Sequence, residues 1–375
     1  MRPFFVKKEN PTESFPSISP YWLRIQRSLF AHAEECLFEV TAEHKEVMAA
    51  LEVLHIEQYV QEPSGIRGRP RISRKALARA FAARGVLGLD DANDLAQRLV
   101  LDVNLRRICG FPGRAPSEST LSRVFTEFAE NEMIRETVLE DQVRLHLGET
   151  VIPHISRDAT SIEVREEPAP KPKKEPRQKK KMGRKKTGEP ATEKVVTRLE
   201  MQREQTWQEA LGELPKVCDF GSKFSSSGYL HHWKGYKLHV DIADGGVPIS
   251  VCLTSASTHD TQAAIPLMKM TDSRTFATLY DLMDRGYDAR VLREVSEELG
   301  HVPLIQGKAR ATSPAKPFDF AEEQRFKNRT VVERFFADLK DNHCGRNIRV
   351  RGWKKVLMHL MFGILAIFAS AVMRI

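Results

Sequence analysis

A charged row near the C-terminal end of the chain has residue types and a spacing suited to binding a metal ion or an anion. The stretch 326–340 fits a helix at about 100° per residue, which places four residues within an arc of about 60°: Phe326, Arg329, Glu333 and Lys340. The opposite face is apolar, with Val331, Val332, Phe335 and Leu339, and with Phe336 at its border. A carboxylate is a ligand of the kind that Mg²⁺ prefers. A surface helix with ion pairs at i,i+4 spacing gives the same pattern, so the rest of the chain must distinguish the two.

The residues from 151 onward alternate between strand and helix patterns, and these elements would position the row. Strands are expected at 151–157, 235–242, 248–254, 276–283 and 302–305, and helices at 261–270 and 290–299. Asp244-Gly245-Gly246 predicts a hairpin turn, and Pro303 indicates that the last strand lies at an edge of the sheet. The first strand ends at Asp158-Ala159-Thr160, and the fourth ends at Asp284.

This order of elements resembles the ribonuclease-H-like fold, where one carboxylate lies on the first strand, one at the end of the fourth strand and one on a later helix. Asp158, Asp284 and Glu333 fall at those places. Phosphodiester cleavage needs an activated nucleophilic oxygen and a stabilised leaving oxygen, and two Mg²⁺ ions about 3.5–4 Å apart can supply both. Three clustered carboxylates repel one another without a metal. The resemblance therefore implies that these three are catalytic and hold two Mg²⁺ ions, with Mn²⁺ as a substitute.

Other carboxylates in the same region fit these places less well: Asp241, Asp281, Asp288, Glu322 and Glu323. Asp241 as the first carboxylate would leave too few strands before the helix at 261–270. Asp281 lies mid-strand on the other face of the pleat. The third can be the N-cap of the next helix, and the two glutamates precede the charged row.

Four motifs resemble, in this order, the bacterial insertion-sequence DDE transposases of the cut-and-paste group marked by a Tyr-Arg-Glu-Lys signature. They are Asp158-Ala159-Thr160, Gly235-Tyr236-Lys237-Leu238-His239, Asp284-Arg285-Gly286-Tyr287-Asp288, and Arg329 to Lys340 with the spacing Arg-x3-Glu-x6-Lys. The resemblance runs from about residue 65 to the end. It implies that Arg329 and Lys340 contact phosphates of the transposon end beside Glu333. Phe326 stands where the family has Tyr, so a hydroxyl is lost but an aromatic ring remains that can pack or stack on DNA.

The first 148 residues predict an all-α region that binds DNA. The run Gly-Arg-Pro-Arg, with Arg69 and Arg71, is similar to hooks that place an arginine in a narrow minor groove. Ser119 and Arg123 lie at the start of a helix and could face phosphates, as in helix-turn-helix proteins. The alternative for the Gly-Arg-Pro-Arg run is a basic turn before a helix. The alternative for the helix with Ser119 and Arg123 is a plain helical bundle.

The polar stretch 166–216 predicts a basic low-complexity insertion after the first strand. Its lysine-rich part cannot bury a core, and it could attract phosphate or serve as a solubilising loop. A helix at 200–214 remains open. We therefore expect three parts: a helical DNA-binding region at 1–148, a catalytic domain at 149–165 and 217–375, and the insertion. The expected fold class is α/β, a ribonuclease-H-like mixed sheet flanked by helices and preceded by the all-α region.

Composition restricts the class of protein further. The 375 residues carry a formal net charge of +8, which favours an anionic partner and nucleic acid first. The five cysteines form no CxxC pair, which indicates a reducing compartment and argues against a structural zinc site. The N-terminus has no secretory apolar segment. The apolar stretch 356–372 has about the minimum length for a membrane span, and a buried core helix is the favoured interpretation over a tail anchor.

Together these features predict a DNA transposase that cuts the ends of an insertion sequence and transfers them into target DNA. Its expected partners are double-stranded DNA, both terminal repeats and target, and further copies of the chain in a homodimer or larger synaptic complex. No membrane partner is expected, and the expected location is the bacterial cytoplasm, at the nucleoid. The alternatives are a non-catalytic DNA-binding regulator derived from a transposase and, third, a tail-anchored membrane protein.

Overall fold

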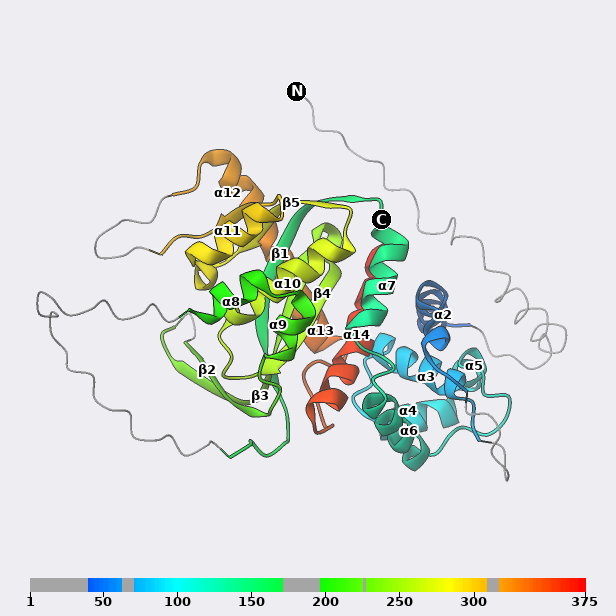
Figure 1. The fold of residues 1–375 in the computed structure, drawn as a ribbon. Helices are drawn as coiled ribbons and strands as arrows, with labels where there is room; N and C mark the ends of the chain where they lie inside the picture. Colours follow the sequence, from blue (N-terminus) through cyan, green and yellow to red (C-terminus); the bar gives the residue numbers. More distant parts are fainter. Residues whose placement is uncertain (1–39, 63–70, 171–195, 225–226, 309–316) are drawn as a thin grey trace, which may run out of the picture.

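The fold combines a helical region with a mixed α/β region, as Figure 1 shows for the computed structural model of the chain. The structure describes residues 40–62, 71–170, 196–224, 227–308 and 317–375. In Figure 1 the helical region lies on the right and the sheet with its helices on the left. Arg69 and the lysine-rich part of the expected insertion, 171–195, lie outside the described residues.

A mixed sheet forms the centre of the α/β region. Its strands are β1 (Val151–Glu163), β2 (Asp219–Phe224), β3 (Leu230–Ala243), β4 (Val247–Ser255), β5 (Ala277–Met283) and β6 (Val302–Ile305). β1 lies between β3, to which it is antiparallel, and β5, to which it is parallel, and β6 forms one edge beside β5. The long β3 pairs with β2 through its first half and with β4 through its second half. This sheet and its flanking helices confirm the expected ribonuclease-H-like class.

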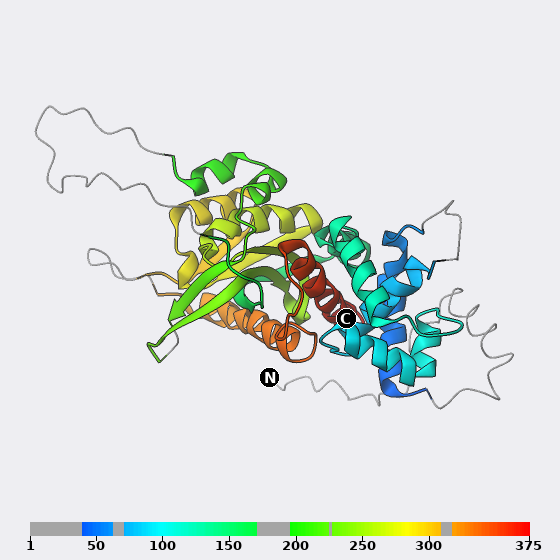
Figure 2. The same cartoon turned by 90° about the horizontal axis from the view of Figure 1, so that it is seen from below.

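Helices cover both faces of the sheet. α10 (Asp260–Arg274) and α11 (Arg290–Glu298) lie on one face, and α13 (Thr330–Asp341) lies on the other, as Figure 2 shows in yellow and orange. Because side chains alternate along a strand, neighbouring residues of β1 serve different faces. Arg157 points toward α10, where it meets Asp241 of β3, whereas Asp158 points toward α13.

The helical region consists of six α-helices within the described residues. They are α2 (Ala42–Leu54), α3 (Arg74–Val86), α4 (Ala92–Leu101), α5 (Val103–Ile108), α6 (Glu118–Glu130) and α7 (Glu136–Leu147), with a 3-10 turn at Ile56–Tyr59. Side-chain N-caps start five of them: Thr41, Ser73, Asp91, Asp102 and Ser117. These residues accept bonds from backbone N–H groups that have no partner within the helix, so polar residues in the sequence mark where the helices begin.

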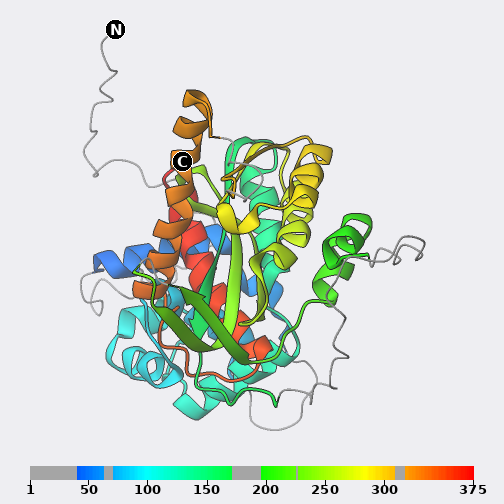
Figure 3. The ribbon, with the colours of Figure 1, turned by 90° about the vertical axis from the view of Figure 1, so that its left-hand side faces the viewer.

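The apolar C-terminal helix α14 (Trp353–Val372) joins the two regions. It packs on α3 and α6 of the helical region and on β4 of the sheet, and Figure 3 shows it in red between them. The crossing with α3 is close, because a Cβ at Gly85 would stand 2.5 Å from the carbonyl oxygen of Phe362. α14 is long and apolar enough to span a membrane, and 83% of its most apolar window is buried inside the protein. It therefore forms part of the core in this structure.

Several elements differ from the sequence-based expectations. The first strand was expected to end at Asp158-Ala159-Thr160, whereas β1 continues to Glu163. The stretch 326–340 is not one α-helix, because α12 (Phe320–Phe326) ends where a 3-10 turn at Lys327–Arg329 begins, and α13 starts only at Thr330. The part of the expected insertion that the structure describes holds α8 (Arg198–Glu204) and α9 (Trp207–Gly212), which pack on α10. Strand β2 was not expected, and it extends the first half of β3. The division into three parts stays a prediction.

Candidate active site

The centre of the candidate site is a guanidinium group that lies between two carboxylates. Arg329 Nη1 donates a bond of 3.1 Å to Asp158 Oδ2 on β1. Its Nη2 donates one of 2.7 Å to Glu333 Oε1, one turn along α13. The Asp158 and Arg329 side chains are largely buried, at 17% and 20% exposure, whereas Glu333 is 57% exposed. Arg329 thus joins the strand to the helix, and Glu333 faces open solvent.

Asp284 stands at the same end of the sheet as Asp158. β5 runs parallel to β1, and Arg157 pairs with Met283, so the residues that follow them, Asp158 and Asp284, are neighbours across the two strands. Asp284 begins a 3-10 turn (Arg285–Tyr287), and its Oδ1 accepts a bond of 2.7 Å from the Gly286 backbone N–H. The structure therefore places Asp158 and Asp284 side by side where β5 ends, a place called the edge of the sheet below, and Arg329 links Glu333 to Asp158 there. The roles of these three residues stay predictions.

The electrostatics of this edge favour a bound cation. Burial raises the pKa of Asp158 to about 6, and the negative charge of Asp284 adds to that effect. A bond of 2.7 Å from the Ala159 backbone N–H and the positive charges of Arg329 and Lys223 act in the opposite direction. A buried carboxylate beside a second carboxylate is stabilised by positive charge, so this edge is suited to cations.

Lys340 lies further along the same face of β1. Its Nζ donates a bond of 2.7 Å to Thr160 Oγ1, two residues beyond Asp158. Burial, with the nearby charge of Arg346, lowers the pKa of this ammonium group. Arg329 and Lys340 thus both lie beside the carboxylates, as the sequence predicted, although DNA contact by either residue is untested.

Phe326 is separated from the rest of the charged row by the 3-10 turn. A 3-10 turn has three residues per turn where an α-helix has 3.6, so the expectation that one regular helix face carries all four residues is wrong. The Phe326 ring packs on Phe318, with ring centroids 5.0 Å apart. It remains half-buried, and a contact between this ring and DNA stays a prediction.

Two of the competing carboxylates are locked in a buried network on the other face of the sheet. Asp241 is fully buried and accepts bonds of 2.6 Å from Arg157 Nη2 and from Thr271 Oγ1. Asp281, also fully buried, accepts bonds from Ser296 Oγ at 2.6 Å and His301 Nδ1 at 3.0 Å. Neither can reach the edge that carries Asp158, because their side chains point toward α10 and α11.

Two of the remaining competitors, Asp288 and Glu322, also have structural partners. Asp288 accepts bonds from Arg293 Nη2 at 3.0 Å and from the Lys308 backbone N–H at 2.9 Å. The N-cap of α11 is Ala289, so the expectation that Asp288 caps that helix is wrong. Glu322 closes a capping box with Asp319 at the start of α12.

The donor set at the edge fits Mg²⁺ in its chemistry, since three carboxylates supply hard oxygen ligands. Among the described residues, however, no three His, Cys, Asp or Glu side chains stand close enough to hold a metal ion in this conformation. Arg329 is bonded to two of the three carboxylates, Asp158 and Glu333.

A basic groove crosses the helical region between α4 and α6. Its volume is about 1440 Å³, and five arginines line it: Arg71, Arg74, Arg106, Arg114 and Arg123. Glu127 also lines it and forms a salt bridge of 2.7 Å with Arg74. Ser119 is exposed at the start of α6, where its carbonyl accepts a bond of 3.1 Å from Arg123 Nε. Arg71 and Arg123, predicted separately from the sequence, thus share one groove.

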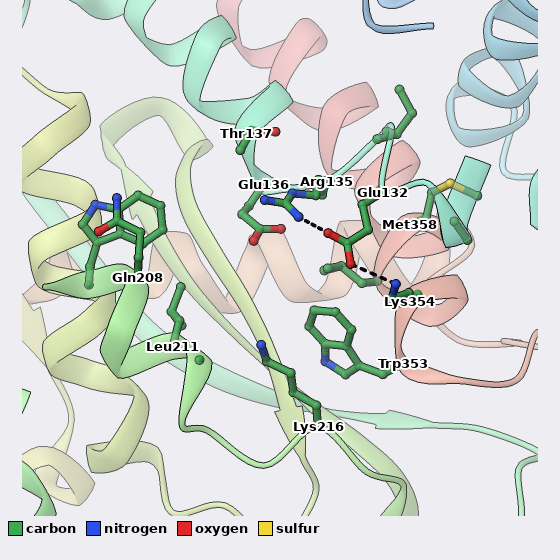
Figure 4. Close-up of a pocket in the computed structure, with 15 residues that line it drawn as sticks. Glu132, Arg135, Glu136, Thr137, Gln208, Leu211, Lys216, Trp353, Lys354 and Met358 are labelled. Atoms are coloured by element: carbon green, nitrogen blue, oxygen red, sulfur yellow. Dashed lines mark hydrogen bonds and ion pairs between the residues drawn. The ribbon is translucent and has the colours of Figure 1, made fainter. Parts of the chain in front are cut away.

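A smaller pocket of about 240 Å³ lies where α9, the connection between α6 and α7, and the start of α14 meet (Figure 4). Lys216 Nζ lies 4.9 Å from the centre of the Trp353 ring, and Glu132 bonds to Arg135 and to Lys354 across the pocket. None of the three carboxylates of the candidate site lines it. Its lining residues join the helical region to the sheet.

Lys223 of β2 is a charged residue that was not expected from the sequence. Its positive charge lowers the pKa of both Asp158 and Lys340. The signal was the alternation of Phe220, Ser222 and Phe224 with other residues, which fits a strand. That stretch was too short, and too close to the polar insertion, to be assigned.

The mixed sheet and its flanking helices are consistent with a ribonuclease-H-like fold. Comparison with protein families makes this more specific. Residues 197–369 match the family described as transposase DDE domain, which includes Asp284 and Glu333 but begins after Asp158. Residues 41–127 match a second family, transposase domain (DUF772), which covers α2 to α6.

Two transposase families thus match one chain, in the order helical region and then sheet, and they support a transposase of the DDE type. No curated protein and no solved structure matches the chain.

Proposed function

We propose that this protein is a Mg²⁺-dependent transposase that binds the ends of an insertion sequence, cleaves them and joins them to target DNA. The observation that carries the proposal is that Asp158 and Asp284 lie side by side on neighbouring parallel strands, with Glu333 joined to Asp158 through Arg329. Arg329 and Lys340 beside them supply positive charge for DNA phosphates. The match of both regions to transposase families supports this proposal.

The chemistry assigns a distinct role to each group. Asp158, Asp284 and Glu333 would hold Mg²⁺, which when bound activates water and stabilises the leaving oxygen of a phosphodiester. Hydrolysis leaves a 3′-hydroxyl on the element end, and that hydroxyl then attacks a phosphodiester of target DNA without a covalent protein intermediate. Arg329, once released from the carboxylates, and Lys340 would orient the phosphates. Phe326 would pack or stack on the DNA where related proteins have Tyr.

The partners and the setting follow from this reaction. Two element ends must be joined to one target, so the active species would be a homodimer or a larger synaptic complex. The charged row matches the Tyr-Arg-Glu-Lys group except at Phe326, and we place the protein in that group. A transposase of this kind would work in the bacterial cytoplasm, at the nucleoid. The groove with Arg71 and Arg123 would bind the duplex of the terminal repeat.

Cleavage of labelled duplex DNA that carries the inverted repeat flanking the gene tests the proposal. With Mg²⁺ the wild-type chain should release a 3′-hydroxyl end, whereas Asp284→Ala and Glu333→Ala should reduce cleavage by about 10³-fold or more, as expected for loss of a group that stabilises the transition state. Glu323→Ala, an exposed carboxylate change on α12, is the control and should cleave normally. Undiminished cleavage by either active-site variant would show that the assignment is wrong.

A non-catalytic DNA-binding regulator derived from a transposase is the second candidate. The observation in its favour is that Arg329 is bonded to both Asp158 and Glu333, two of the three carboxylates that would hold the metal. Binding to the terminal repeat without cleavage at any Mg²⁺ or Mn²⁺ concentration would support this candidate against the first.

A further inference from the structure

A two-stranded arm extends from the sheet beside the candidate active site. β2 pairs with the first half of β3 in a register that runs from Asp219 opposite Gly235 to Phe224 opposite Leu230. The pairing of β1 with β3 ends where Glu163 lies opposite Gly235, so the arm continues past the end of β1. Figure 2 shows it in green, extending beyond the sheet.

One face of this arm carries three exposed apolar side chains together with Ser222, His232 and Lys234. Phe224 and Leu230 lie opposite each other near the tip, 69% and 48% exposed, and Phe220 further down the same face is 53% exposed. A two-stranded hairpin has no core of its own in which to bury such side chains. Exposed apolar groups gathered on one face indicate a surface that meets a partner.

The other face of the arm carries Lys223 and, nearer its base, Trp233. Lys223 lies opposite His231, whose Nε2 is 3.6 Å from Glu163 Oε1 on β1. The His231 ring stacks on Trp233, which is buried and packs so closely over Gly221 that a Cβ there would stand 2.2 Å from the indole. The arm is thus held in place at its base by the packing of Trp233, and β1, which carries Asp158, pairs with the same strand β3.

We infer that this arm binds the DNA beside the phosphate that is cleaved, with Lys223 on the backbone and Phe224 and Leu230 against the adjoining groove. The inference rests on the proposed function. Lysines contact phosphates and fix the register of a protein on DNA, and apolar side chains that enter a groove pack against sugars and base edges. Lys223 would be a positioning residue that acts together with Arg329 and Lys340.

The charges of the arm favour DNA over a second copy of the chain. Lys223, His231, His232 and Lys234 are the basic residues of its described part. The acidic groups at its base already have partners, since Asp219 bonds to Ser257 and Glu163 lies beside His231. A surface with this balance complements a phosphate backbone and not another basic chain.

The test compares full-length variants on the inverted-repeat duplex, with binding measured at several salt concentrations without metal and cleavage measured with Mg²⁺. Lys223→Ala should reduce the slope of log affinity against log salt by about 1, as expected for one lost phosphate contact. It should also reduce cleavage about tenfold, and Lys223→Arg should restore the slope. The double variant Phe224→Ala/Leu230→Ala should weaken binding about tenfold with the slope unchanged, since it removes no charge.

Matched controls separate this effect from general charge or surface changes. Lys45→Ala removes an exposed lysine from α2, on the opposite side of the molecule in Figure 1, and Phe276→Ala removes an exposed ring that lies before β5. Both should bind and cleave as the wild type does.

A wild-type salt slope and rate for Lys223→Ala would overturn the inference, and so would arm variants that bind DNA normally but change the oligomeric mass. If the wild-type chain does not cleave, or Asp284→Ala cleaves equally well, the proposed function itself fails.

Discussion

Neighbouring charged residues of β1 point to opposite faces of the sheet and meet different partners. Asp158 on β1 points to the edge where Arg329 and Glu333 lie, whereas its neighbour Arg157 points to the other face and binds Asp241. Asp241 is fully buried and bonded on that closed face. The alternation of side chains along β1 thus separates the side that faces Arg329 and Glu333 from a buried ion-pair network.

Asp241→Asn should therefore affect stability more than chemistry. The change removes the charge partner of the buried Arg157 guanidinium, and breaking a buried pair is costly, so the free energy of unfolding should fall by about 3 kcal/mol. Urea unfolding measures this effect. Asp284→Asn, at a half-exposed position, should change stability by less than about 1 kcal/mol and yet abolish cleavage. Equal stability losses in the two variants would contradict this division.

At the scale of elements, the crossing of α3 and α14 depends on a small residue. Gly85 of α3 faces the backbone of α14, where a Cβ would stand 2.5 Å from the Phe362 carbonyl oxygen and 3.3 Å from the Gly363 nitrogen. Backbone atoms cannot move away by a change of rotamer, as side-chain atoms can. The two helices would therefore have to separate.

Gly85→Ala should destabilise the protein by about 2 kcal/mol, as overpacking of a core does. Gly212→Ala is the matched control, because among the described residues no atom lies within 4 Å of a Cβ at that position. Urea unfolding of both variants would check this, and a neutral Gly85→Ala would show that the crossing tolerates more space than the structure indicates.

The same pair of helices carries a group that makes the protein sensitive to acid. His359 of α14 is buried, with Nε2 2.9 Å from the Cys344 carbonyl oxygen and Nδ1 3.0 Å from Arg84 Nη2. Burial and the charge of Arg84 lower the pKa of His359 from 6.5 to about 3. The unfolded chain binds a proton near pH 6.5 and the folded chain does not, so stability is lost as the pH falls below that value.

His359→Gln should reduce this acid sensitivity, since an amide can donate and accept in the same places but does not titrate. Between pH 7 and pH 5 the wild type should lose about 2 kcal/mol more stability than the variant. Urea unfolding of both proteins at pH 7 and pH 5 gives this difference. The contributions of the other titrating groups are the same in both proteins and cancel. The same loss in both proteins would mean that His359 is not the group responsible.

At the scale of the whole molecule, the chain presents basic surfaces at two places that one core connects. The groove between α4 and α6 carries Arg71 and Arg123, and the edge of the sheet carries Arg329, Lys340 and Lys223. α14 packs against both regions. A duplex bound in the groove would therefore be held at a fixed position relative to Arg329 and Lys340.

Arg123→Ala should weaken binding of the terminal repeat and leave the chemical step intact. Loss of one phosphate contact should lower the salt slope of binding by about 1, while cleavage at saturating DNA should equal that of the wild type. Arg290→Ala, which removes a 76% exposed arginine from α11, is the control and should change neither. A fall in the saturated rate alone would place Arg123 in a different role.

Much of the catalytic region could be predicted from the sequence, because its signals are local. Strand and helix periodicity, the turn Asp244-Gly245-Gly246 and the edge proline Pro303 each act over a few residues, and β3, β4, β5 and β6 were found on that basis. The less regular elements could not be predicted in this way. The 3-10 turn before α13 divides the charged row, and β2 is stable only because β3 lies beside it.

Local patterns in the chain predicted most strands and helices of the α/β region, since periodicity and turn residues act over a few residues. The choice of Asp158, Asp284 and Glu333 came from the resemblance to ribonuclease-H-like proteins. Only the tertiary structure decided what surrounds them. It placed Arg329 between Asp158 and Glu333, closed Asp241 into a buried ion pair, and brought Lys223 to the edge. The reason is physical: pairing of distant strands and packing of α13 set these contacts, and no local pattern encodes which charges meet.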